Sequence, residues 1–326
     1  MRAAIVGLAG PALLDEEAAL FRDHRPAGAI LFARNIHDPQ QVAALSAAIR
    51  AVLPPHAVIA VDQEGGRVAR LRPPHWHAHP PAAAFEYLGA RAAWLTGALI
   101  GIDCAAAGID LVCAPVLDVR VSGAHDVIGD RAFSSDPDVV ARLAQAMAVG
   151  LMAAGVQPVG KHAPGHGRAM VDSHAALPQV PPDQDLTDDM LPFILCHGLP
   201  WMMTAHILYS ALDPAWPATL SPAIIGRVIR GRIGFKGVLV SDDLAMSALT
   251  GHPGARAARA VAAGCDLALH CSGVLADTAE VLRDCPDITD LTLARLAAAR
   301  AMALAARVPL DGLALAAERD ALLVAA

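Results

Sequence analysis

This 326-residue chain has few charged side chains, few aromatic ones and no long uninterrupted apolar run. Charged residues make up 17% of the sequence and aromatic residues 4%, whereas hydrophobic residues reach 55%. The long apolar-looking stretch at 291–317 contains Arg295, Arg300, Arg307 and Asp311, so it lacks the roughly 20 apolar residues that a membrane-spanning helix requires. So high an apolar content also excludes general disorder. The composition predicts a folded globular protein.

The chain has no excess of positive charge. Twenty-five basic residues stand against 32 acidic ones, which gives a formal net charge of −7. A polyanion binds mainly through lysine and arginine, so the composition argues against a nucleic acid as the main partner.

The sequence also lacks the cysteine patterns of secreted or metal-binding scaffolds. It has six cysteines and no CxxC pair, which favours buried, reduced thiols in a cytoplasmic protein. The apolar N-terminal stretch resembles a signal peptide only superficially, because Gly7, Gly10 and Pro11 interrupt it and three acidic residues follow it. We therefore expect a cytoplasmic location.

Short apolar runs alternate along the chain with longer stretches of helical pattern. The runs are mostly continuous rather than alternating, which is typical of parallel strands covered on both faces. They lie at 3–8, 28–32, 57–62, 110–115, 156–162, 200–206, 237–243 and 265–270. The helical stretches lie at 15–24, 38–53, 86–107, 136–154, 221–233, 253–263 and 274–283.

This alternation predicts the α/β class and a (β/α)8 barrel of the TIM type in a single domain. The barrel is expected over about 1–285, with a C-terminal helical tail over about 286–326 that packs on its bottom or side. A doubly wound open sheet is the alternative. No GxGxxG follows the first strand, so its nucleotide-binding version has little support.

Polar side chains follow most of the predicted strands at the point where each strand ends. They are Asp62, Asp118, Lys161, His162, His206, Asp242, Asp243 and His270. Barrel enzymes place their active sites at the carboxyl ends of the strands. We therefore expect these residues to converge on one pocket of mixed charge. Any one of them could instead cap a strand and bond to loop backbone.

Three segments carry a resemblance to a known family. They are DQEGGRV at 62–68, KHAPGHG at 161–167 with its continuation DSH at 172–174, and SDDLAM at 241–246. In this order they resemble glycoside hydrolase family 3, and more narrowly its single-domain bacterial β-N-acetylglucosaminidases of peptidoglycan recycling. The resemblance covers roughly 1–275, and Ala163 departs from it because the family usually has Phe there.

The resemblance implies a catalytic pair. Asp242 is the implied nucleophile, His174 the implied proton donor and acceptor, and Asp172 the residue that orients His174. Retaining cleavage requires an anionic nucleophile and an acid at the leaving oxygen. A histidine, with a pKa near ~6.5, can give and regain a proton near neutrality. Without the motif, 172–174 could be a simple loop turn; its place in a long proline-rich loop, 164–182, leads us to expect a lid.

The resemblance also implies a set of sugar-binding residues, namely Asp62, Arg70, Arg131, Lys161 and His162. We expect Arg67 to pair with a carboxylate and Asp243 to orient neighbouring backbone or arginine groups. For Glu64 we expect a structural role at the tight Gly65-Gly66 turn.

The function implied by the resemblance is that of a retaining exo-β-N-acetylglucosaminidase. It would cleave terminal GlcNAc from GlcNAc-1,6-anhydroMurNAc and its peptides during cell-wall recycling, through a covalent glycosyl-aspartate. We expect a monomer with a small-molecule substrate, no cofactor and no metal.

Other functions remain open at this point. They are a phosphorylase that uses phosphate in place of water, another β-glycosidase of the same family, a metal-dependent amidohydrolase and a sugar-binding module. A zinc site on His162, His166, Asp172 and His174 would suit the amidohydrolase, but no HExxH supports it. The HWHAH stretch at 75–79 could be a metal-binding tract, but the prolines on either side favour an exposed loop.

Overall fold

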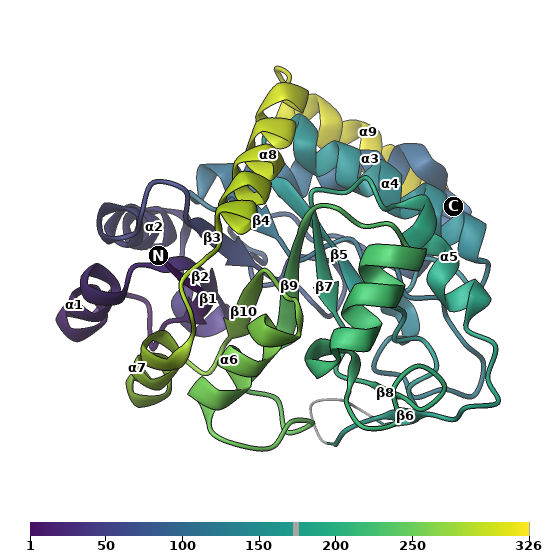
Figure 1. Cartoon of the computed structure of the whole chain (residues 1–326). Coiled ribbons are helices and arrows are strands. Elements are labelled where there is room, and N and C mark those ends of the chain that lie inside the picture. The colour runs from purple at the N-terminus through teal and green to yellow at the C-terminus, as the bar shows by residue number, and fades with distance from the viewer. Residues whose placement is uncertain (172–175, 326) are drawn as a thin grey trace.

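Eight parallel strands close into a barrel in the computed structural model, which describes residues 1–171 and 176–325 (Figure 1). Around the barrel the strands follow the order β1-β10-β9-β7-β5-β4-β3-β2. They are β1 (Arg2–Gly7), β2 (Pro26–Leu31), β3 (Val58–Val61), β4 (Leu111–Val112), β5 (Gln157–Ala163), β7 (Trp201–Thr204), β9 (Val238–Asp243) and β10 (Leu267–His270). The predicted α/β class and (β/α)8 barrel are confirmed.

Each predicted apolar run overlaps one strand of the barrel. The strands are buried along nearly their whole length, as expected for a parallel sheet with helices outside and side chains inside. Strand β4 is shorter than predicted, since it ends at Val112, close before Pro115, which has no N–H for a ladder bond.

The helices also lie where the sequence predicts them. They are α1 (Asp15–His24), α2 (Pro39–Val52), α3 (Phe85–Ala106), α4 (Pro137–Ala153), α6 (Pro253–Ala263) and α7 (Leu275–Asp284). Asp38 accepts the N–H of Gln41 at the start of α2, and Asp136 caps α4 in the same way. Such caps satisfy N–H groups that the first helical turn leaves unpaired.

Several elements depart from the expected pattern. The predicted helix at 221–233 begins with Ser221, whose hydroxyl accepts the N–H of Ile224, and continues as the π-helical η5 (Ile224–Arg232). Helix α5 (Thr187–Leu195) is not predicted, and Pro192 within it weakens the helical signal. Strands β6 (Gln179–Val180) and β8 (Leu208–Tyr209) pair outside the barrel. Short 3-10 turns form η1 (Ala33–Asn35), η2 (Ala82–Ala84), η3 (Gly129–Arg131) and η4 (Ala218–Leu220).

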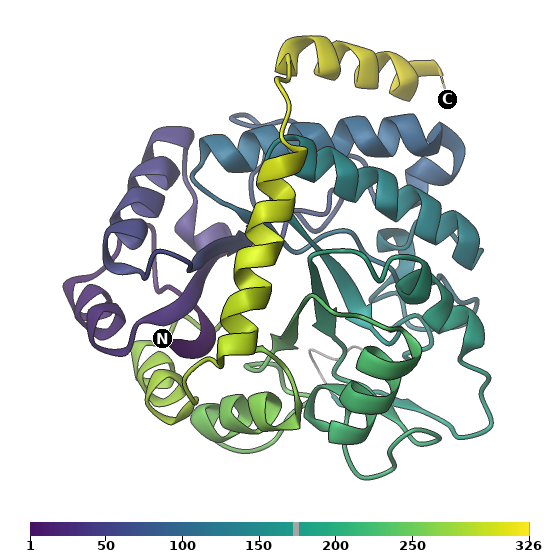
Figure 2. The same cartoon turned by 45° about the horizontal axis from the view of Figure 1, so that its top comes forward.

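The C-terminal tail forms two helices, in agreement with the helical tail predicted from the sequence. Helix α8 (Asp290–Ala306) contacts β5, β9 and α4, and α9 (Gly312–Ala325) packs along α3 on the outside of the barrel (Figure 2). None of the helices in the described residues combines the length and the apolar character needed to cross a membrane.

Candidate active site

A pocket opens at the carboxyl ends of the barrel strands. Its lining includes six of the predicted site residues, namely Asp62, Arg70, Arg131, Lys161, His162 and Asp242. They reach it from the ends of β3, β5 and β9 and from the loops that follow β3 and β4. The predicted Asp172 and His174 lie outside the described residues.

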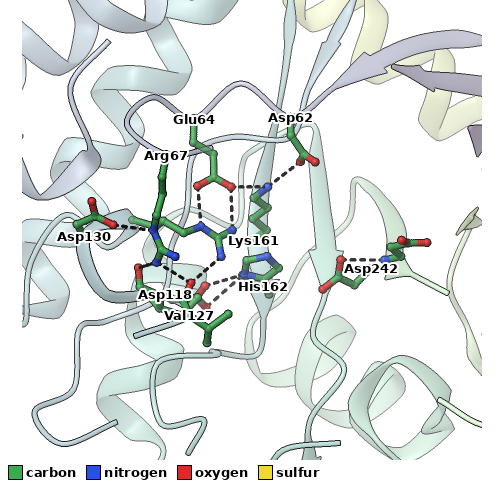
Figure 3. A network of polar contacts seen from close by, with 12 residues as sticks. Asp62, Glu64, Arg67, Asp118, Val127, Asp130, Lys161, His162 and Asp242 are labelled. Atoms are coloured by element: carbon green, nitrogen blue, oxygen red, sulfur yellow. Dashed lines mark hydrogen bonds and ion pairs between the residues drawn. The ribbon is translucent and has the colours of Figure 1, made fainter. Parts of the chain in front are cut away.

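Buried charges of both signs form a network along one wall of this pocket. Lys161 Nζ lies 3.1 Å from Asp62 Oδ1 and 2.7 Å from Glu64 Oε1, so it bridges the two carboxylates (Figure 3). Arg131 donates two hydrogen bonds of 2.8 Å to Glu64, and Arg70 donates one of 3.1 Å to Asp62. Each buried charge thus has an oppositely charged partner, as burial requires.

The opposite charges of this network keep Glu64 and Lys161 ionised. Burial raises the pKa of Glu64, but Arg131 and Lys161 outweigh it and hold that pKa well below its usual range. Burial likewise opposes the charge of Lys161, but Glu64 and Asp62 keep its pKa above the ordinary value. The pocket therefore offers fixed donors and acceptors of the kind that bind sugar hydroxyls.

Glu64 has a larger part in the site than the sequence suggested. The turn at Gly65 and Gly66 is present, with φ values of 107° and 54° in the left-handed region that glycine tolerates. The Glu64 side chain is nevertheless a counter-ion of Lys161 and Arg131 inside the pocket. The glutamate in DQEGG was a signal for this, because an acidic residue three positions after the end of β3 lies near the mouth of the barrel.

Arg67 and Arg70 have separate roles, as expected. Arg67 Nε donates to Asp130 Oδ1 at 3.0 Å, and its Nη2 donates to the main-chain oxygen of Val127 at 3.1 Å. This confirms the predicted pairing of Arg67 with a carboxylate, while Arg70 lines the pocket.

A buried aspartate orients His162. Asp118 Oδ2 lies 2.7 Å from Nδ1 of His162, and Asp118 Oδ1 accepts the main-chain N–H groups of His162 and His166 at 3.1 and 2.7 Å. An aspartate at Nδ1 accepts the proton on that nitrogen and fixes the orientation of the ring. Asp118 thus positions a pocket residue.

Asp242 stands at the end of β9 on the other side of the pocket (Figure 3). Burial raises its pKa, but His162, His206, the N–H of Asp243 and Lys161 together lower it to about 2. Asp242 is therefore a carboxylate at neutral pH. Its neighbour Asp243 accepts the N–H groups of Ala245 and Cys271, both at 2.9 Å, which confirms the predicted role of Asp243 in holding backbone.

Two strand-end histidines do not reach the pocket, so the expectation that they would converge on it is wrong for them. His270 Nε2 lies 3.0 Å from Ser272 Oγ and 3.8 Å from Asp277 Oδ2 of α7, so its ring faces α7 and not the pocket. His206 lies behind the pocket wall, where Nε2 is 2.9 Å from the main-chain oxygen of Asp243.

The HWHAH stretch is only partly the exposed loop we expected. His75 is exposed, but His79 is buried and its Nδ1 lies 3.1 Å from Arg319 of α9. Burial, with help from Arg319 and His77, lowers the pKa of His79 to about 3. Among the described residues, no group of three or more His, Cys, Asp or Glu side chains is arranged to hold a metal ion.

Comparisons with known proteins agree on one family. The model of the glycosyl hydrolase family 3 N-terminal domain matches residues 5–304. The chain is 43% identical to a beta-hexosaminidase of Alkalilimnicola ehrlichii over 90% of this chain and 87% of that protein. It is 41% identical to a beta-hexosaminidase of Aromatoleum aromaticum over 91% of this chain and 86% of that one.

Solved structures show the same relationship. The structure of NagZ from Neisseria gonorrhoeae in complex with N-trifluoroacetyl-D-glucosamine is similar, with a TM-score of 0.86, 33% identity and 98% of both chains covered. A family 3 beta-N-acetylglucosaminidase from Paenibacillus is 34% identical, with a TM-score of 0.83, over 95% of this chain and 63% of that one.

Proposed function

Because this chain belongs to glycosyl hydrolase family 3 and is a glycosidase, we propose that it is a retaining exo-β-N-acetylglucosaminidase of cell-wall recycling. Its proposed substrate is GlcNAc-1,6-anhydroMurNAc with or without a peptide, and its proposed place of action is the cytoplasm. The similar beta-N-acetylglucosaminidase from Paenibacillus, and the N-acylated glucosamine bound to NagZ, support the preference for GlcNAc. The observation that carries the proposal is an ionised Asp242 facing buried sugar-binding charges across one pocket.

Asp242 is the proposed nucleophile. Its carboxylate attacks the anomeric carbon of GlcNAc, the bond from that carbon to the bridging oxygen breaks, and a glycosyl-aspartate forms. The low pKa of Asp242 keeps it anionic over the whole neutral range. The N–H of Asp243, 2.8 Å from Asp242 Oδ1, holds the side chain in place.

His174 is the proposed acid and base. Its imidazolium gives a proton to the leaving oxygen, and the resulting neutral ring then takes a proton from the water that attacks the glycosyl-aspartate. This second step releases GlcNAc and restores the Asp242 carboxylate. Asp172 is proposed to orient the ring, as an aspartate does in a Ser-His-Asp triad. The lid expected for 164–182 stays part of this proposal.

Asp62, Arg70, Arg131, Lys161 and His162 are the proposed sugar-binding residues. Asp62 can accept from two adjacent hydroxyls, and Lys161 and Arg70 beside it supply donors. Since the charges are already paired with each other, the site is ordered before the sugar binds, which lowers the entropic cost of binding.

Trapping of the intermediate tests the nucleophile. A 5-fluoro GlcNAc donor should label one peptide, and mass mapping should place the label on Asp242. Asp242→Ala should lower kcat by roughly 10³-fold or more, while Asp277→Ala, on α7 outside the pocket, should not. A label on another carboxylate, or a folded and active Asp242→Ala enzyme, would contradict the assignment.

Substrates whose leaving groups differ in pKa test whether His174 is the general acid. His174→Ala should slow cleavage of the poor leaving group 1,6-anhydroMurNAc by about 10²- to 10⁴-fold, and cleavage of a 2,4-dinitrophenyl glycoside much less. Equal losses on both substrates would rule out His174 as the acid. Running both reactions with phosphate distinguishes hydrolysis from phosphorolysis, since only the latter yields GlcNAc-1-phosphate.

A further inference from the structure

A second cavity, of about 840 Å³, has in its lining Ser247, the residue that follows the pocket-lining Met246. We call it the Trp216 groove. It runs between the loop that leads into η4 and the first half of α6, two elements that pack together. Its lining includes Trp216, Leu220, Leu249, Arg256 and Arg259. None of the residues above, and no step of the proposed reaction, assigns it a role.

The groove carries positive charge, and none of its described lining residues is acidic. The guanidinium of Arg259 stacks on the Trp216 ring, with its carbon 3.2 Å from the ring centroid. Arg256 donates only to main-chain oxygens, among them that of Leu244 at 2.7 Å. Within the described residues, no carboxylate pairs with either arginine, and no acidic residue lines the groove. In a chain of net charge −7, this is a local site for an anion.

Trp216 adds an apolar surface to this charge. Arg259 lies over the Trp216 ring, and 39% of Trp216 remains exposed. A planar cation on an aromatic ring is a stable pair, and stacking leaves the in-plane N–H groups of the guanidinium able to donate. The combination suits a ligand that has both a carboxylate and an apolar face.

The lining of the groove continues that of the active-site pocket along the chain. Asp242, Asp243 and Met246 line the pocket, and the next residues along the chain, 247–250, line the groove. Ala176 and Leu177 also line it, and they follow the proposed acid His174 by two and three positions. An aglycone bonded through the bridging oxygen must extend out of the pocket, and the groove is lined by the residues that continue the chain from the pocket wall.

We propose that the Trp216 groove is an aglycone subsite for a sugar that carries a carboxylate. Arg259 donates to the carboxylate, and Trp216 packs against the apolar part of the aglycone. This inference rests on the proposed function and deepens it, because it makes negative charge on the aglycone a determinant of specificity. The carboxylate can belong to the lactyl group of 1,6-anhydroMurNAc or to an attached peptide.

Kinetics on three GlcNAc β-glycosides test the subsite. The aglycones are 4-nitrophenol, which has no carboxylate, 1,6-anhydroMurNAc, and 1,6-anhydroMurNAc-tripeptide. The readout is the ratio of kcat/KM for a carboxylated aglycone to kcat/KM for 4-nitrophenol. Arg259→Ala should lower this ratio about tenfold through KM, since a charge-assisted hydrogen bond is lost, and Arg259→Lys should restore part of it.

Controls separate the subsite from stability and from the reaction itself. Arg142→Ala removes an exposed arginine of α4 that lines none of the described pockets, and it should leave the ratio as in the wild type. Trp216→Phe should lower the ratio less than Trp216→Ala, and melting temperatures identify any variant that folds poorly. Added salt should lower the wild-type ratio more than that of Arg259→Ala.

A lower ratio for both carboxylated aglycones in Arg259→Ala identifies the lactyl carboxylate as the group that the groove binds. A lower ratio for the tripeptide alone identifies a carboxylate of the peptide. An unchanged ratio in folded Arg259→Ala overturns the subsite. If the wild type releases no 4-nitrophenol, the proposed function fails instead, and direct binding of 1,6-anhydroMurNAc-tripeptide to wild type and Arg259→Ala still decides whether the groove binds this ligand.

Discussion

At the scale of single residues, the site depends on charges that are buried and mutually neutralised. Lys161 has an exposed side-chain fraction of 3% and Glu64 one of 6%, and each would be costly to bury alone. Removal of one partner should therefore lower the free energy of unfolding by more than an exposed ion pair contributes to it. The reason is that the remaining charge stays buried without a counter-ion.

Glu64→Gln tests this balance through pH. The folded-state pKa of Glu64 lies below its ordinary value of 4.5, so its ion pairs stabilise the fold above that pH and are lost as the pH falls toward the folded-state value. We expect the variant to be less stable by about 3 kcal/mol at pH 7. Urea unfolding should show this difference unchanged down to about pH 5 and shrinking below it. A difference independent of pH would contradict the ion pairing.

At the scale of elements, the helices around the barrel pack closely where glycines allow it. Helices α3 and α4 cross at Gly97 and Gly150. A Cβ atom on Gly150 would lie 2.2 Å from the main-chain oxygen of Trp94, and one on Gly97 would lie 2.1 Å from that of Met147. The helix backbones are therefore in direct contact, and no larger residue fits without moving them apart.

Gly150→Ala should lower the free energy of unfolding by about 1–3 kcal/mol, because α4 must shift to accept the methyl group. Gly226→Ala is the matched control in η5, where a Cβ would meet nothing within 4 Å. It should be neutral or stabilising by up to about 1 kcal/mol. Urea unfolding of both variants measures the contrast, and equal effects would show that the crossing is not tight.

At the scale of the whole molecule, the C-terminal helix connects with the turn at Gly65 and Gly66. Arg319 of α9 donates to the main-chain oxygen of Ala78 at 3.2 Å and lies 3.1 Å from His79 Nδ1. The main-chain oxygen of His79 in turn accepts the N–H of Gly66 at 2.9 Å. Gly66 belongs to the turn that leads to Arg70. An outer helix thus supports the pocket wall.

Arg319→Ala should disturb this connection without touching the reacting groups. We expect a loss of about 1–3 kcal/mol in unfolding free energy, since buried acceptors lose their donor, and a several-fold rise in KM for GlcNAc glycosides with a smaller change in kcat. Arg300→Ala, on the exposed face of α8, is the control and should change neither. A fall in kcat with no change in KM would contradict a role of Arg319 in supporting the pocket wall.

Much of this fold and site follows from local patterns. Continuous apolar runs predicted every barrel strand, because a parallel strand is buried on both faces whatever its neighbours are. Motifs at the strand ends predicted Asp62, Lys161 and Asp242 as parts of one pocket. The outward-facing His270 was misplaced, because the sequence alone does not say on which side of the barrel a terminal strand residue lies.

Sequence by itself therefore determined the order of the elements, the barrel and the family, since burial and helix capping act over a few neighbouring residues. Only the tertiary structure decided which charges meet. Lys161 and Asp62 are 99 positions apart, and their contact depends on how β3 and β5 are placed when the barrel closes. The same holds for Arg319 with His79 and for Arg259 with Trp216, because a distance between side chains on separate elements is set by packing and not by local preference.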